Sequence, residues 1–240
     1  MIKERIRAYF PHHLEAEGQL TTKKSMYVAD YTEETRNKEK KEHVKLVDDP
    51  SKVTIEGYFT LNNPPGIVIT GLPFDQKSFT KYDKNIASQC ECVIYPEGND
   101  EESWICFIET KYIKNEKNSK GGEKIRNKKI FEWKKSERLK KALKQLYETQ
   151  EYYRSKGIFS KKNKCYLFAS LPLHKEPFLS PKKNKAGILE DYQNSIEKAI
   201  CAHKNFSTPA PFLTQTKCEN NLIIRFTNSA EVLNHTMLRV

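Results

Sequence analysis

Hydrophobic and polar positions are most clearly ordered in the stretch from residue 90 to residue 112. Two short runs rich in β-branched and aromatic residues, 90–95 and 104–112, flank a segment, 96–103, that contains Pro, Gly, Asn and acidic residues. This composition is typical of two antiparallel strands joined by a turn. The pattern therefore predicts a β-hairpin.

The predicted hairpin carries charged residues inside its apolar runs. Side chains alternate between the faces of a strand, so Glu109 and Lys111 share a face, and Glu91 shares one with Val93. If the hairpin is symmetric about Asp100, Glu91 lies directly opposite Glu109. Opposite residues have Cβ atoms about 4.5–5.5 Å apart, where like charges destabilise the pair. Two carboxylates placed in this way would be stabilised by a bound cation, whereas a slip of one residue would put them on opposite faces.

Further strands are predicted on both sides of this hairpin. The runs 53–61 and 66–71 read as two strands around the turn 62–65, and 79–83 leads into the hairpin, so the sheet is expected to begin antiparallel. The run 164–171 is nearly all apolar, as in a strand that is buried on both faces.

Helical periodicity is clearest over residues 136–157. Its apolar residues recur at three- and four-residue steps, with Ser136 as a predicted cap and Gly157 as a predicted end. The polar run 32–45 is compatible with an exposed helix, and 188–203 has the pattern of an amphipathic helix.

Chain length and composition favour one domain over the 240 residues. We expect a core over about 53–171, with elaborations at 1–52 and 172–240; the second includes a strand at 221–226. That second elaboration could shape substrate access or form a contact in a homodimer. With 30% charged residues and no apolar run of about 18 residues, we expect a cytoplasmic protein without a membrane partner.

The formal net charge of +11 favours a polyanionic partner, because clustered Lys and Arg gain affinity for phosphates by releasing counterions. Basic residues crowd the segment 111–144, which suggests nucleic acid, although a Lys-rich surface can also serve solubility alone. The candidate nucleic-acid-binding residues are Lys114, Lys117, Lys124, Arg126, Lys128 and Lys129.

The six cysteines do not suggest a set of disulfides. Four of them, Cys90, Cys92, Cys106 and Cys165, fall within apolar runs and are expected to be buried thiols. A zinc site at Cys90 and Cys92 is not favoured, because no second Cys/His pair has the usual spacing.

The order strand, strand, strand, helix, strand, together with three short motifs, resembles the PD-(D/E)XK nuclease superfamily. Residues 90–94 read C-E-C-V-I, 107–111 read F-I-E-T-K, and 142–149 read A-L-K-Q-L-Y-E-T. Small prokaryotic members read roughly C-D-x-(V/L)-(I/L), F-(I/V)-E-L-K and A-x-x-Q-L-x-x-T. The match covers residues 79–171. It departs at Glu91, where Asp is usual, and at Thr110, where an aliphatic residue is common.

The resemblance implies an α/β protein with a restriction-endonuclease-like αβββαβ core, in which helices flank a mixed central sheet. It further implies a nuclease that depends on Mg²⁺, with Mn²⁺ as an alternative, and acts on DNA in preference to RNA. Glu91, Glu109 and the backbone carbonyl of Thr110 would hold the metal, and Lys111 would assist the attacking water. Asp83 and Gln145 are candidate supporting residues.

This chemistry suits the residue types. Phosphodiester hydrolysis needs charge neutralisation at phosphorus and an activated water, and Mg²⁺ held by one or two carboxylates can supply both. Simpler readings remain open: an exposed ion pair between Glu109 and Lys111, a turn at Asp83, and plain helix packing of Gln145. At the level of function, the alternatives are a non-catalytic nucleic-acid-binding module on the same fold and a protein-interaction subunit.

Overall fold

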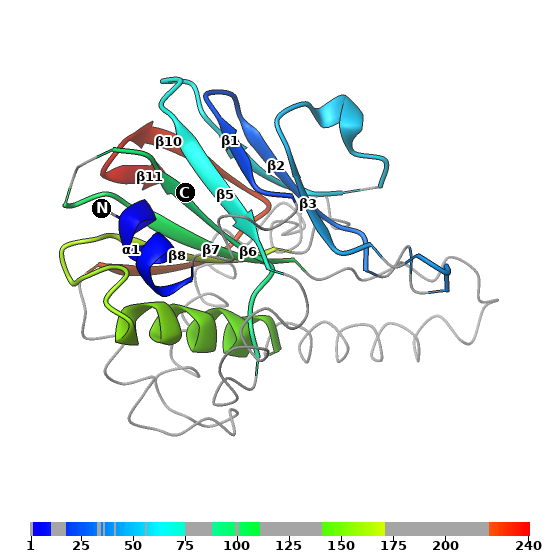
Figure 1. Ribbon diagram of the computed structural model, residues 1–240. Coiled ribbons are helices and arrows are strands. Elements are labelled where there is room, and N and C mark those ends of the chain that lie inside the picture. Colours follow the sequence, from blue (N-terminus) through cyan, green and yellow to red (C-terminus); the bar gives the residue numbers. More distant parts are fainter. Residues whose placement is uncertain are drawn as a thin grey trace, which may run out of the picture.

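Two mixed β-sheets packed face to face form the framework of this α/β chain (Figure 1). The computed structural model describes residues 2–10, 18–32, 35, 37–40, 42–55, 57–74, 88–98, 101–110, 141–170 and 221–240. The predicted strand at 79–83, the start of the helix predicted from residue 136, and the predicted helix at 188–203 lie outside these residues.

Sheet A has six strands in the order β1-β5-β6-β7-β8-β9. Their bounds are β1 Leu20–Thr22, β5 Ile69–Pro73, β6 Cys92–Pro96, β7 Ile105–Thr110, β8 Cys165–Ser170 and β9 Leu222–Phe226. The pairs β1–β5, β5–β6 and β6–β7 are antiparallel, whereas β7, β8 and β9 run parallel to one another. The segment between β7 and β8 includes a helix over residues 141–155, as is usual for a crossover between parallel strands.

Sheet B has five strands in the order β11-β10-β4-β2-β3. Their bounds are β2 Met26–Asp30, β3 Val44–Val47, β4 Phe59–Asn62, β10 Ser229–Asn234 and β11 Met237–Arg239. Strands β10 and β4 are parallel, and the other pairs are antiparallel. Sheet B therefore combines β2 and β3 from the N-terminal part of the chain, β10 and β11 from the C-terminal part, and β4 from the region predicted as the core.

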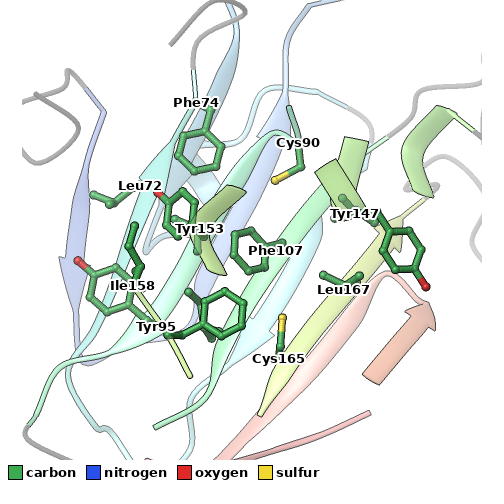
Figure 2. Close-up of a cluster of buried hydrophobic side chains, with 14 of the residues drawn as sticks. Leu72, Phe74, Cys90, Tyr95, Phe107, Tyr147, Tyr153, Ile158, Cys165 and Leu167 are labelled. Atoms are coloured by element: carbon green, nitrogen blue, oxygen red, sulfur yellow. The ribbon is translucent and has the colours of Figure 1, made fainter. Parts of the chain in front are cut away.

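The helix over 141–155 and α1 (Ile2–Tyr9) cover one face of sheet A (Figure 1). Figure 2 shows side chains of the core on this face, with Tyr153 close to Phe107. The helix-side core consists of Ile2, Ile6, Phe10, Leu72, Phe74, Cys90, Val93, Tyr95, Ile105, Phe107, Ala142, Leu143, Leu146, Tyr147, Tyr153, Ile158, Phe159, Cys165, Leu167 and Ala169. Tyr153 is central to it: its ring meets Phe107 edge to face at 5.4 Å and stacks on Phe10 at 5.5 Å.

Sheet B covers the other face of sheet A. The inter-sheet core consists of Met26, Val28, Val44, Leu46, Phe59, Leu61, Ile69, Cys92, Ile94, Trp104, Cys106, Ile108, Tyr166, Phe168, Ala230, Val232 and Leu238. Phe59 of β4 stacks on Phe168 of β8 at 5.2 Å, and the Trp104 indole donates a hydrogen bond to the Asn234 carbonyl at 2.9 Å. The described helices therefore lie on one side of sheet A, and sheet B lies on the other.

Four predicted strands, at 90–95, 104–112, 164–171 and 221–226, are confirmed as β6, β7, β8 and β9 within the described residues. The predicted pairing of 53–61 with 66–71 is wrong, because β4 belongs to sheet B and β5 to sheet A. Asn63 explains this, since its side-chain amide donates to the carbonyls of Lys23 at 2.9 Å and Ile67 at 2.8 Å. These bonds fix the connection as a passage between the sheets.

The described residues of the polar run 32–45 do not form the helix that its charges suggest. Its described residues make turns and bends, and β3 begins at Val44. The buried Thr35 hydroxyl donates to the Tyr31 carbonyl at 2.9 Å and accepts the Glu42 amide at 2.9 Å. The Thr35 side chain thus ties Tyr31 to Glu42 and holds this region as a loop.

Cys90, Cys92, Cys106 and Cys165 are free, buried thiols, as predicted. Cys90 belongs to the helix-side core and Cys92 to the inter-sheet core, so the two thiols lie on opposite faces of sheet A. No helix in the described ranges is both long and apolar enough to cross a membrane.

Candidate metal and nucleic-acid site

One edge of sheet A gathers the candidate site residues. Strands β5, β7 and β8 end at this edge and β6 begins there, because Pro73 pairs with Cys92, Cys92 with Ile108, and Thr110 with Ser170. The carboxyl ends of parallel strands are the usual place for ligands in open α/β sheets. Glu91, Glu109 and Thr110 all lie at this edge.

Glu109 occupies the next-to-last position of β7, the strand in the middle of the mixed sheet, and its residue is 0% exposed. Side chains alternate along β7, so Glu109 lies on the same face as Ile105 and Phe107, which is the face covered by the helices. Thr110 lies on the face of Ile108, which is covered by sheet B. A carboxylate can be buried only at a high cost in free energy unless a partner or a metal ion compensates its charge. Glu109 is therefore an unusual residue for a central strand.

The register of the hairpin is the predicted one over its paired residues. Cys92 pairs with Ile108, Val93 with Phe107 and Ile94 with Cys106, which is the register symmetric about residue 100. The regular ladder stops at Cys92, and residue 91 lies in a bend.

The bend changes the environment expected for Glu91. The Glu91 amide donates to the Ile108 carbonyl at 3.0 Å, and the Glu91 carbonyl accepts the Phe74 amide at 2.8 Å. Cys90 joins Val93 in the helix-side core, so the strand alternation that predicted Glu91 on the face of Val93 does not continue through the bend. Glu91 thus stands beside the end of the ladder rather than within it.

The charges of Glu109 and Glu91 nevertheless both raise the pKa of the same two thiols, those of Cys90 and Cys92. Burial, followed by the negative charge of Glu109 and then that of Glu91, holds the pKa of the Cys90 thiol well above its usual range. Burial and the neighbouring thiols raise the pKa of Cys92, and both carboxylates add to the shift. These thiols therefore stay protonated and are poor nucleophiles and metal ligands.

The helix over 141–155 holds the segment that leads to Glu91. Gln145 donates through Nε2 to the Gln89 carbonyl at 2.7 Å, and the Cys90 amide donates to Thr149 Oγ1 at 2.8 Å. The Ser88 hydroxyl bonds to the Glu148 carboxylate. Gln145 is thus brought to the candidate site, and its buried Oε1 has no hydrogen-bond partner among the described residues.

Sequence reasoning passed over Thr149 and Gln89 as functional positions. Thr149 ends the A-x-x-Q-L-x-x-T motif and lies four residues after Gln145, on the same helix face, which was an available signal. Gln89 acts through its backbone carbonyl, which no residue type in the sequence could indicate.

Several predicted site residues lie outside the described ranges. They are Asp83, Lys111, Lys114, Lys117, Lys124, Arg126, Lys128 and Lys129. Their placement at the site stays a prediction.

The described oxygen atoms suit a hard cation. Two carboxylates and the Thr110 carbonyl at one sheet edge are oxygen donors of the kind that Mg²⁺ prefers, and Mg²⁺ commonly uses only one or two carboxylates together with water. In the part of the chain that the structure describes, no three His, Cys, Asp or Glu side chains cluster as a metal site. Oxygen donors alone suit Mg²⁺, whereas zinc sites commonly use Cys sulfur and His nitrogen.

Comparisons with family models, with curated proteins and with solved structures give no match to this chain.

Proposed function

We propose that this chain is a Mg²⁺-dependent nuclease that hydrolyses phosphodiester bonds in DNA, with RNA as the less favoured substrate. The observation that carries the proposal is the fully buried Glu109 at the end of β7, with Glu91 in the bend just before β6, where its amide donates to the Ile108 carbonyl at 3.0 Å. A bound cation would offset the repulsion between the two carboxylates and use both as ligands.

The topology supports the proposal. Helix α1, the antiparallel strands β5, β6 and β7, the helix over 141–155 and the parallel strand β8 follow the αβββαβ order of a restriction-endonuclease-like core, with β1 to β4 inserted after α1. In that reading, sheet B is an addition that covers the face of sheet A opposite the helices.

In the proposed mechanism, the carboxylates of Glu109 and Glu91 would hold the ion, and the Thr110 backbone carbonyl would be a third donor. When bound, Mg²⁺ supplies a Lewis acid for the phosphate and lowers the pKa of a water molecule. As a neutral amine, Lys111 would take a proton from the attacking water; as an ammonium, it would orient that water and stabilise the negative charge that develops on the phosphate. The basic residues of 114–129 bind the phosphate backbone of the substrate.

The bend at Glu91 favours a second candidate, a nucleic-acid-binding module on the same fold without catalysis. Glu91 lies outside the regular ladder and has one methylene more than the Asp that is usual at this position. Both features change the reach of its carboxylate. If Glu91 cannot join Glu109 at a metal, the basic surface would bind nucleic acid without cleaving it.

A cleavage screen separates the candidates. The full chain is incubated with single-stranded and duplex DNA and RNA in Mg²⁺ or Mn²⁺, beside Glu109→Gln and Lys111→Ala purified in the same way. Metal-dependent cleavage by the wild type that both variants lose supports the nuclease. Binding without cleavage that weakens steeply with salt supports the binding module. Absence of nucleic-acid binding at low salt would instead indicate a protein-interaction subunit.

A further inference from the structure

A buried threonine on the helix over 141–155 holds the backbone that leads into β6. Thr149 is 0% exposed, and its hydroxyl takes part in two hydrogen bonds. It donates to the Gln145 carbonyl at 2.8 Å and accepts the Cys90 amide at 2.8 Å. The first bond lies within the helix and the second spans 59 residues of sequence, so Thr149 joins the helix to the residue before Glu91.

The segment 88–91 needs partners of this kind because it lies before the ladder. Buried backbone groups must find hydrogen bonds, and strand pairing with β7 starts only at Cys92. The helix supplies the missing partners through Thr149 at Cys90 and Gln145 at Gln89. Helix side chains thus set the path of the chain where a neighbouring strand does not.

We propose that Thr149 is a positioning residue for the Glu91 carboxylate, an inference that rests on the proposed metal site. The Cys90 amide is fixed by Thr149, while the amide and carbonyl of Glu91 are fixed by Ile108 at 3.0 Å and Phe74 at 2.8 Å. These bonds on both sides fix the Cα of Glu91. A fixed Cα matters more for Glu than for Asp, because the longer side chain has one more rotatable bond to order.

Thr149 donates to a carbonyl of its own helix, as threonines in helices commonly do. Thr149 does more, because its oxygen also accepts from a distant amide that is buried. Thr149→Val keeps the shape of the side chain but removes both bonds and leaves the Cys90 amide without this acceptor. Thr149→Ser keeps the hydroxyl.

The experiment measures Mn²⁺ binding by calorimetry, with the metal alone and the full chain. Groups that orient a metal ligand typically change metal affinity by about 10–100-fold. Thr149→Val is expected to bind Mn²⁺ more weakly by that factor, whereas Thr149→Ser binds as the wild type does. Amide exchange without metal, followed by mass spectrometry, is expected to be faster over residues 88–92 in Thr149→Val.

Thr70→Val is the matched stability control. Thr70 is also 0% exposed, and its hydroxyl bonds to Glu97 at 2.6 Å and to Thr21 at 2.8 Å. It lies near the start of β5, at the edge of sheet A opposite Glu91, since Ile69 pairs with Pro96. We expect Thr70→Val to lower the melting temperature and to leave Mn²⁺ affinity unchanged.

The outcomes separate the two proposals. If the wild type binds no Mn²⁺, the metal site fails and the positioning role fails with it. If the wild type binds Mn²⁺ and Thr149→Val binds it equally well while losing stability as Thr70→Val does, only the positioning role is overturned. Should Thr149→Val not fold, Gln145→Leu removes the adjacent bond to the Gln89 carbonyl and is judged by the same comparison.

Discussion

Replacing Gly71 by alanine tests the packing of sheet B on sheet A. A Cβ at Gly71, in the middle of β5, would lie 2.6 Å from Leu46 Cδ1 and 2.7 Å from Met26 Sδ. Carbon atoms in ordinary contact are about 3.5–4.0 Å apart, so the sheets or these side chains must move by roughly 1 Å. Overpacking of this size costs about 1–3 kcal/mol.

Two effects reduce that cost. Met26 and Leu46 can change rotamer, and removing a glycine from a strand returns about 0.5–1 kcal/mol. We therefore expect Gly71→Ala to lower the free energy of unfolding by about 1–2 kcal/mol. For a chain of this size, that corresponds to a fall in melting temperature of roughly 2–8 °C.

A double-mutant cycle with Leu46→Ala isolates the contact. Leu46→Ala vacates the space that the new Cβ enters, so the cost of Gly71→Ala should shrink by about 1 kcal/mol in that background. Gly157→Ala is the control, because nothing lies within 4 Å of its Cβ and its cost comes from a φ of +67°. Its effect should add to that of Leu46→Ala. A stabilised Gly71→Ala, or strict additivity with Leu46→Ala, would refute the packing described.

Two further predictions concern ionisable groups. Burial raises the pKa of Cys90, Cys92, Cys106 and Cys165. These thiols should therefore resist iodoacetamide at about pH 8 in the native protein and react after unfolding, which peptide mass spectrometry measures. Rapid alkylation of the native protein would contradict their burial. Burial acts to raise the pKa of Glu97, but the bonds from Lys3 and Thr70 outweigh it and leave this pKa lowered. The stability that Glu97 contributes is therefore present above its usual pKa of about 4.3 and lost as the pH falls through the lowered value. Urea unfolding of Glu97→Gln should differ from that of the wild type at neutral pH and converge with it in acid; a constant difference would show that Glu97 does not titrate in this way.

The hairpin was predictable because its information is local. The apolar runs of β6 and β7 and the polar segment between them fix both the strands and the register about residue 100. The bend at Glu91 was not predictable, because it follows contacts with Thr149 and Phe74, far away in the sequence.

Sheet B was missed for a related reason. Its strands have only three to six residues, and they come from segments separated by most of the chain. Such short runs carry little periodicity, and their pairing depends on the apolar face of sheet A that they cover. The passage from β4 to β5 likewise includes a long-range contact, from the Asn63 side chain to the Lys23 carbonyl, inside a stretch that reads as a hairpin turn.

The nuclease proposal is tested most directly by the rate of DNA cleavage in Mg²⁺ by the wild type and by Glu109→Gln, purified in parallel. Glu109→Gln keeps the size of the buried side chain and removes the charge that would hold the ion. The proposal predicts cleavage by the wild type that a chelator abolishes, and a rate for Glu109→Gln that is no higher than the rate without protein. Equal cleavage by both proteins, or none by the wild type on any DNA substrate, would contradict it.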